Sequence, residues 1–235
     1  MTRHFDLLVP GAKQAFGALS VLAPYDRQII ATVATADEET VDLALNNAQS
    51  LFNDRSRWLK AETRLDILNK TAELMVENAE TLALEAAREG GKPLFDSRIE
   101  VSRAIEGMHV CIETLKTASG TEIPMNLNAS SACKLAFTRH EPIGVVVAVS
   151  AFNHPLNLIV HQVAPAIAAG CPVIVKPAED TPLSCYRFVQ LLYQAGLPND
   201  WCQCLMTENT AVATHLVTSP VVGFFSFIGS ARVGW

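Results

Sequence analysis

The feature that most constrains the fold is a change in hydrophobic period near residue 141. Before it, apolar residues recur at the three- and four-residue spacing of helices. After it, the residues from Ile143 to Val149 form a continuous, mostly β-branched run of strand length. Such a run is expected of a strand covered on both faces. The sequence therefore predicts a helical N-terminal segment followed by a buried, mostly parallel sheet.

The helical half begins at a sequence with the form of a capping box. Thr35-Ala36-Asp37-Glu38 has the Thr-x-x-Glu pattern, and it predicts a helix from about Asp37 to Phe52. Helical periodicity continues from Leu59 to Gly90, where Gly90-Gly91-Lys92-Pro93 supplies a stop signal. Another helix is predicted from about Phe95 to Ala118. Its expected buried positions include Ile99, Ile105, Met108 and Ile112.

Strands and helices alternate in the second half. Helices are predicted for Pro155 to Ala169, Pro182 to Gln194 and Thr210 to Val217. Strands are predicted for Cys171 to Lys176, Cys202 to Met206 and Val221 to Phe227. This alternation indicates right-handed βαβ crossovers and an α/β fold, a Rossmann-like parallel sheet with flanking helices. Ligands bind beyond the carboxyl ends of the strands in such sheets, so the residues just after each strand are the candidate site.

Polar residues follow three of these strands. The segments are Ser150-Ala151-Phe152-Asn153-His154, Lys176-Pro177-Ala178-Glu179 and Gly229-Ser230. Asn153 offers a neutral amide that can stabilise an oxyanion without exchanging a proton. Lys176 and Glu179 place a cation and an anion three residues apart, suited to hydroxyl groups. Gly229 and Ser230 open a helix, where free N–H groups and the helix dipole attract phosphate.

Each of these residues also has a purely structural interpretation. Asn153 precedes His-Pro and equally suits a cap for the helix that starts near Pro155. Seen in isolation, Lys176 and Glu179 are better explained as a solvated ion pair, and Gly229-Ser230 more often forms a simple helix cap. The residues themselves leave both interpretations open.

Neither histidine nor cysteine spacing predicts a metal site. His154 and His161 are seven residues apart but have no third ligand, which favours packing or capping. The six cysteines are scattered, and Cys202 and Cys204 have one residue between them instead of the usual two. We expect reduced thiols of a cytosolic protein. Cys171 heads an apolar strand and is interpreted as a buried structural thiol, not a nucleophile.

Composition excludes several classes of protein. The chain has 235 residues, of which 49% are hydrophobic, which suffices for a packed core. With 18 Lys and Arg against 24 Asp and Glu, it lacks the positive charge of a nucleic-acid binder. The apolar run from Leu158 to Val175 is interrupted by polar residues, proline and glycine, so no membrane span is predicted. Met1 to Pro10 lacks the apolar region of a signal peptide. We expect a cytoplasmic protein.

Taken in order, the strand-end segments resemble the aldehyde dehydrogenase superfamily. Five collinear blocks carry the resemblance: Glu141 to Val146 through Asn153-His154-Pro155-Leu156, Ala164 to Cys171, Val175 to Ser184, Ala195 to Pro198, and Phe227 to Ser230 with Val233-Gly234. The likeness is strongest from Glu141 to Ser184 and weak before Trp58. It implies an enzyme that oxidises a small-molecule aldehyde with NAD(P).

The resemblance implies roles for individual residues. Asn153 is the expected catalytic residue, an amide that holds the oxyanion. Lys176 and Glu179 are expected to bind the adenosine ribose, and Gly229 and Ser230 the diphosphate. The expected cofactor cleft also includes Ser150, Ala151, Phe152, Pro177 and Ala178. A carboxylate at Glu179 repels an added 2′-phosphate, so NAD is expected rather than NADP.

The resemblance also divides the chain into three parts. Residues 1–123 are the expected helical part of the cofactor-binding domain, and residues 141–235 its Rossmann-like part. Residues 124–140, from Pro124 to His140, are expected to form protruding strands through which family members assemble, so a homo-oligomer is expected. No nucleic-acid or membrane partner and no metal are expected.

Several segments depart from the family pattern. Phe152-Asn153-His154-Pro155 stands where Trp-Asn-Phe-Pro is common, a change expected to alter the substrate pocket. Ile228 replaces a usual threonine, and Met206 to Val217 lacks the glycines that often line the cleft, which puts cofactor affinity in doubt.

Length is the largest departure. In the family, the nucleophilic Cys and the general-base Glu follow the Gly-Ser helix, whereas this sequence stops at Trp235. In a complete enzyme, a Cys thiolate attacks the aldehyde, hydride passes to nicotinamide, and water or another acceptor releases the thioester. We therefore expect a truncated aldehyde dehydrogenase chain, inactive by itself. A non-catalytic nucleotide-binding or assembly module with the same fold is the alternative.

Overall fold

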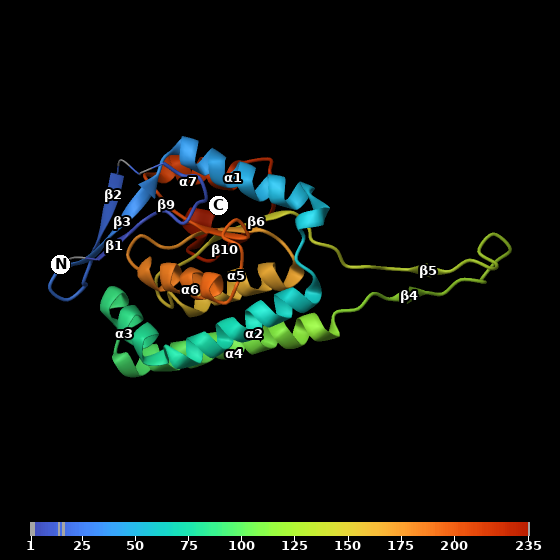
Figure 1. The fold of residues 1–235 in the computed structure, drawn as a ribbon, viewed down its shortest axis with the longest axis horizontal. Helices are drawn as coiled ribbons and strands as arrows, with labels where there is room; N and C mark the ends of the chain where they lie inside the picture. The colour runs from blue at the N-terminus through green and yellow to red at the C-terminus, as the bar shows by residue number, and fades with distance from the viewer. Residues whose placement is uncertain (1–2, 14, 16, 235) are drawn as a thin grey trace.

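A computed structural model describes residues 3–13, 15 and 17–234 (Figure 1). The predictions for the first and last segments of the chain extend to Met1 and Trp235, and these two residues lie outside the described residues. The central sheet has the strand order β10-β6-β7-β8, and all its neighbours are parallel. These strands are β6 (Val145–Val149), β7 (Val173–Lys176), β8 (Cys202–Cys204) and β10 (Val222–Phe227). The predicted α/β fold is confirmed.

Helices connect the parallel strands as the alternating pattern predicts. Helix α5 (Asn157–Ala169) joins β6 to β7, and α6 (Leu183–Gln194) joins β7 to β8. Helix α7 (Thr210–Thr218) precedes β10, which returns to the opposite side of β6. The strand order therefore reverses at β6. In doubly wound sheets, the crevice at such a reversal is where ligands bind.

The apolar run of β6 is buried on both faces. Val145 and Val147 pack into a core shared with α1 and α7, whereas Val146 and Ala148 pack into a second core shared with α5 and α6. Removing each valine side chain from water contributes roughly 1.5–3 kcal/mol. Two helical layers thus explain why β6 shows no alternation of polar and apolar residues.

Three strands precede the helical half, and the sequence analysis did not predict them. They are β1 (Arg3–Phe5), β2 (Gly17–Leu22) and β3 (Ile29–Ala36), in the order β1-β3-β2. The short strand β9 (Met206–Thr207) pairs with β3, so the predicted strand from Cys202 to Met206 is divided between two sheets. This second sheet joins the N-terminal residues to the Rossmann-like part.

The predicted capping box at Thr35 is wrong. Thr35 belongs to β3, where it pairs with Gly17 and Met206. Helix α1 (Glu38–Asn53) is instead capped by Asp37, whose side chain accepts a hydrogen bond from the backbone nitrogen of Thr40 at 2.9 Å. Because the ladder of β3 fixes Thr35, the cap moves two residues along the chain.

The remaining helices form a layer below α5 and α6 (Figure 1). A 3-10 turn (Arg55–Arg57) leads to α2 (Ala61–Glu77), α3 (Ala79–Gly90) and α4 (Leu94–Thr117). The predicted helical stretch from Leu59 to Gly90 is thus two helices, divided at Asn78. Met108 and Ile112 are buried as predicted, but Ile99 is 37% exposed, which contradicts its assignment to the core.

A two-stranded antiparallel hairpin extends away from the body (Figure 1). It consists of β4 (Glu122–Ile123) and β5 (Ala136–Phe137), so β5 lies in the range 124–140 given to the protruding strands, whereas β4 lies just before it. The last described element is a short helix, α8 (Ala231–Gly234). Among the described residues, no helix is long and apolar enough to cross a membrane.

Candidate functional site

Backbone hydrogen bonds hold the ends of three central strands together. The nitrogen of Ser150, after β6, donates to the carbonyl of Lys176 at the end of β7 at 3.2 Å. The nitrogen of Ile228, after β10, donates to the carbonyl of Val149 at 2.9 Å. The three predicted strand-end segments therefore meet at one edge of the sheet, beside the reversal in strand order.

Gln162 of α5 forms hydrogen bonds with the backbone at this edge, and sequence reasoning missed it. It is buried in α5, and its Nε2 donates to the carbonyl of Val149 at 3.1 Å and to that of Ser226 at 2.9 Å. One side chain thus bridges the ends of β6 and β10. A polar residue within an apolar helix is the sequence signal that identifies it.

Lys176 and Glu179 form an ion pair that is exposed to solvent on the glutamate side only. Nζ of Lys176 lies 4.0 Å from Oε1 of Glu179, but the lysine is only 8% exposed while the glutamate side chain is 63% exposed. Burial lowers the pKa of Lys176, and the nearby Glu179 acts in the opposite direction. The nearest recorded hydrogen bond of Nζ is a long one, 3.4 Å, to the carbonyl of Pro177. The ammonium group therefore keeps donor capacity at the strand end.

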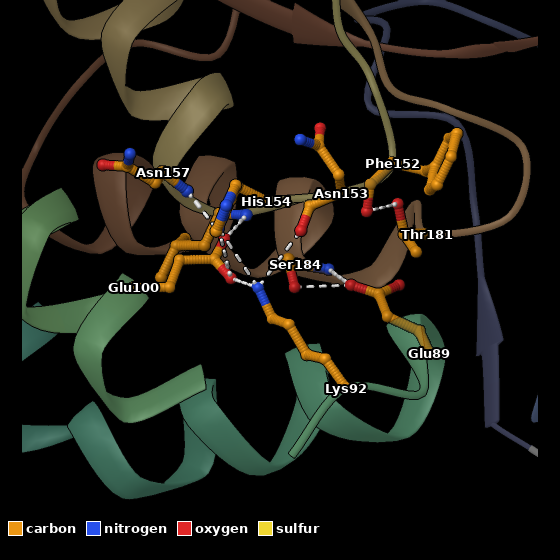
Figure 2. Close-up of polar contacts among 10 residues, drawn as sticks. Glu89, Lys92, Glu100, Phe152, Asn153, His154, Asn157, Thr181 and Ser184 are labelled. Carbon is orange, nitrogen blue, oxygen red and sulfur yellow. Dashed lines mark hydrogen bonds and ion pairs between the residues drawn. The ribbon is translucent and has the colours of Figure 1, made fainter. Parts of the chain in front are cut away.

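Asn153 lies in the exposed turn between β6 and α5. Helix α5 is capped at Leu156, without a capping side chain from its own N-terminus. The N–H groups of Leu156 and Asn157 donate instead to Oε1 of Glu100, at 2.8 Å and 3.0 Å. The capping interpretation of Asn153 is therefore wrong. Figure 2 shows its side-chain amide pointing away from this cluster.

A second buried carboxylate caps the next helix. Oε2 of Glu89 accepts a hydrogen bond from the nitrogen of Leu183 at 2.6 Å, and Oε1 accepts from the nitrogen of Ser184 at 2.9 Å and from its hydroxyl (Figure 2). Burial raises the pKa of Glu89 to about 8, while these hydrogen bonds act to lower it. Sequence reasoning missed Glu89 and Glu100, both of which lie on the buried, mostly apolar faces of their helices.

His154 contacts charged residues of the helical layer. Its Nδ1 lies 3.4 Å from Nζ of Lys92 and 3.8 Å from Oε2 of Glu100 (Figure 2). The imidazole is thus directed toward α4. A packing or capping role was expected for His154, and its contacts in the structure are polar. His161 belongs to α5 and is exposed.

The other predicted residues lie around the same edge. Phe152 and Glu179 line one groove of about 370 Å³, and the carbonyl of Phe152 accepts a long hydrogen bond from Thr181. The hydroxyl of Ser150 is buried without a hydrogen-bond partner in the described part of the chain. Gly229 and Ser230 are exposed at the start of α8, where the carbonyl of Ser230 accepts from Val233 and Gly234 at 3.1 Å.

The cysteines are all free, and four of them are buried: Cys171, Cys185, Cys202 and Cys204. Burial raises the pKa values of Cys185 and Cys202 well above the ordinary thiol value. Low-pKa thiolates act as nucleophiles, so neither thiol has that character. In the residues that the structure describes, no group of three His, Cys, Asp or Glu side chains is placed to hold a metal ion.

Fold and site together define a doubly wound α/β protein with polar strand ends at the reversal in strand order. A profile of the aldehyde dehydrogenase family matches residues 12–235, and the chain belongs to this family. The resemblance found in the sequence is thereby confirmed.

Relatives and solved structures agree with this assignment. The chain is 35% identical over 217 residues to the 3-sulfolactaldehyde dehydrogenase of Priestia megaterium. The matched stretch covers 92% of this chain and 45% of the relative. Aldehyde dehydrogenase 21 from Physcomitrella patens, solved with succinate, superposes with a TM-score of 0.93 at 29% identity, covering 100% of this chain and 49% of the other.

A third comparison concerns a cofactor. Glyceraldehyde-3-phosphate dehydrogenase from Methanocaldococcus jannaschii, solved with NADP, superposes with a TM-score of 0.85 at 30% identity, covering 92% of this chain and 47% of the other. In each comparison, this chain spans about half the length of the protein it matches.

Proposed function

We propose that this chain forms the cofactor-binding part of an NAD-dependent aldehyde dehydrogenase. The observation that supports it most is the state of Lys176, a buried ammonium group with spare donors at the end of β7. Burying such a charge with only long contacts to Glu179 and Pro177 is costly, and a ligand rich in hydroxyl oxygens supplies closer ones. The buried, unpartnered hydroxyl of Ser150 on the neighbouring strand end supports the same interpretation.

The residues at the sheet edge divide the binding of the cofactor among them. Lys176 and Glu179 hold the adenosine ribose, and Gly229 and Ser230 approach the diphosphate. The walls of the cleft are Ser150, Ala151, Phe152, Pro177 and Ala178. When bound, the nicotinamide ring supplies the hydride acceptor for oxidation.

Glu179 is the basis for preferring NAD over NADP. Its carboxylate is exposed 4.0 Å from Lys176, so an added 2′-phosphate on the ribose would be brought close to a negative charge. A relative with the same fold was solved with NADP, so the fold alone does not select NAD, and the local charge is the basis of the proposed preference.

Asn153 supplies the oxyanion-stabilising amide. Its side chain is exposed, and the capping task of its turn is carried out by Glu100, so the amide is available to a substrate. An amide donor stabilises the developing negative charge without changing its own protonation state. The substrate class is a small-molecule aldehyde. The buried thiols of this chain supply no nucleophile for it.

A second candidate is a non-catalytic nucleotide-binding or assembly module with the same fold. Both candidates include a homo-oligomer assembled through the β4–β5 hairpin, whose exposed apolar residues are otherwise in water. These are Ile123, Leu127, Leu135 and Phe137.

Binding of nucleotide to the purified chain tests the proposal. We expect NADH fluorescence titrations to show saturable binding, lost in Lys176→Met and retained in Lys70→Met, a change at an exposed lysine of α2. Absence of NADH binding at millimolar concentration, or equal binding by Lys176→Met, would falsify the assignment of the cofactor site. Both variants should have the circular dichroism of the parent chain, which controls for loss of folding.

A further inference from the structure

The turn between α3 and α4 lies directly against the turn that carries Asn153. Glu89 ends α3 and caps α6, while Glu100 in α4 caps α5. These are the helices that follow β7 and β6, the two strands whose ends form the candidate site. A single helical hairpin therefore holds the first residues of both helices.

Lys92 is the one side chain of this turn that contacts the backbone of Asn153. Its ammonium group forms an ion pair with Glu100 and donates to the carbonyl of Asn153 at 3.3 Å (Figure 2). It also lies 3.4 Å from Nδ1 of His154. A lysine ammonium carries three N–H donors, so these contacts account for its full capacity. The Lys92 side chain is only 16% exposed, which limits competition from water.

The Asn153 turn is held at both ends by this pair. Lys92 binds the carbonyl of Asn153 at its start, and Glu100 binds the nitrogens of Leu156 and Asn157 at its end. Among the residues that the structure describes, none forms a hydrogen bond with the side chain of Asn153, so the position of its amide depends on the backbone of the turn. Because Glu100 is buried, it requires a cation, and Lys92 supplies that cation at the Asn153 carbonyl.

We propose that Lys92 is a positioning residue that, together with Glu100, fixes the turn presenting the Asn153 amide. Its importance for catalysis rests on the proposed function, in which that amide meets the oxyanion. Displacing a catalytic group by about 1 Å can reduce a rate by roughly a hundredfold, so a turn fixed at both ends has a clear chemical use. Lys92 touches no substrate in this arrangement. It acts through the backbone of Asn153.

Hydrogen exchange measured by mass spectrometry on the purified chain tests the proposal without needing activity. In Lys92→Met, the amides of residues 152–158 should exchange roughly tenfold faster than in the parent chain, because a hydrogen bond to a charged group is lost from the turn. Lys92→Arg, which keeps a cationic donor, should restore most of the protection. Residues 181–186 should keep their exchange rates in both variants.

Glu89→Gln is the matched control. It changes the corresponding cap on α6 but leaves the contacts of Lys92 intact, so it should alter residues 181–186 and spare 152–158. If Lys92→Met does not fold by circular dichroism, Glu100→Gln replaces it, since the amide oxygen still accepts from α5 while the ion pair is lost. Unchanged exchange of residues 152–158 in the folded variant, or an equal increase throughout the chain, would overturn the proposal. NADH titrations of the same samples report separately on the cofactor site.

Discussion

Oε1 of Glu100 lies 2.8 Å from the backbone nitrogen of Leu156, although 56 residues separate them in the sequence. The same oxygen accepts from Asn157, and the other oxygen of this buried carboxylate pairs with Lys92. Helix α5 thus receives its cap from α4, a different layer of the fold. The same contacts of Glu100 therefore stabilise the fold and position the turn of the candidate site.

The first prediction compares Glu100→Ala with Asn153→Ala. Removing Glu100 leaves the partly buried Lys92 unpaired and two helix amides uncapped, so the free energy of unfolding should fall by roughly 3 kcal/mol or more. Asn153→Ala removes an exposed side chain with no recorded bonds and should change it by less than about 0.5 kcal/mol. Urea denaturation of both variants measures the difference. A larger loss for Asn153→Ala would restore its capping interpretation.

The second prediction concerns the pH dependence of stability. Burial raises the pKa of Glu89 to about 8, above its unfolded value of 4.5. Below pH 4.5 Glu89 is protonated in both the folded and the unfolded state, so its contribution to the free energy of unfolding is complete. Between pH 4.5 and 8 only the folded state keeps the proton, and the contribution declines until it is lost. Each pH unit in this window costs about 1.4 kcal/mol per proton. Glu89→Gln should flatten this decline in thermal unfolding measured from pH 5 to 9. A parallel decline in both proteins would assign it to another group.

A third prediction addresses the choice of cofactor. Glu179→Gln should relax discrimination against NADP, because it removes the carboxylate that would repel the 2′-phosphate. Parallel titrations of the parent chain and the variant with NADH and NADPH measure the ratio of dissociation constants. Glu77→Gln, a change at the distant end of α2, is the control for net charge. An unchanged ratio would remove Glu179 from the site.

Neighbouring glycines in the α3–α4 turn should respond in opposite directions to the same substitution. Gly91 has a φ of +70°, and an added Cβ would lie 2.9 Å from Cβ of Pro24, so Gly91→Ala should destabilise the chain by at least 1–2 kcal/mol, a rough figure. Gly90 is helical and its added Cβ meets only ordinary contact, so Gly90→Ala should stabilise by up to about 1 kcal/mol. Thermal melting of both variants compares the signs. Equal effects would contradict the conformational argument.

The fifth prediction concerns the isolated chain. It should not oxidise aldehydes, since four of its cysteines are buried and burial raises the pKa values of Cys185 and Cys202, and it should associate in solution. Phe224 and Phe225 are 52% and 41% exposed on β10, the edge strand of the central sheet, and exposed apolar edges favour association. NADH absorbance with a panel of small aldehydes and mass from light scattering provide the measurements. Turnover that survives removal of contaminating enzymes would require a nucleophile among the six cysteines.

Much of the central sheet follows from the sequence, because its strands are continuous apolar runs between helical segments. The run from Ile143 to Val149 contains β6, and the stretch from Cys171 to Lys176 contains β7. The strands β1 to β3 escaped prediction because they form a mixed sheet at the side of the domain. In β3 the buried residues are small or β-branched and do not alternate regularly, and this pattern merges with the helix that follows.

The candidate site divides in the same way. Strand-end residues such as Asn153 and Lys176 are found by topology, since parallel strands present their carboxyl ends at one edge. Their supports are not, because the contacts cross between layers: Glu89 reaches Ser184, 95 residues away, and Glu100 reaches Leu156. The spacing of residues within one segment cannot predict contacts between residues that are so far apart in the sequence. An acidic residue on an apolar helix face is the signal that remains.

The pairing of β6 with β10 also has a consequence for how the chain is made. One edge of β6 can be paired with β7 soon after residue 176 is available, but its other edge waits for Phe227, which pairs with Val149. At typical synthesis rates of about 5–20 residues per second, the stretch from residue 176 to residue 227 takes roughly 3–10 s. For that time a buried, valine-rich strand has an open side in the growing chain. The ribosome-bound protein should therefore engage chaperones most strongly in this interval, and less once β10 has emerged.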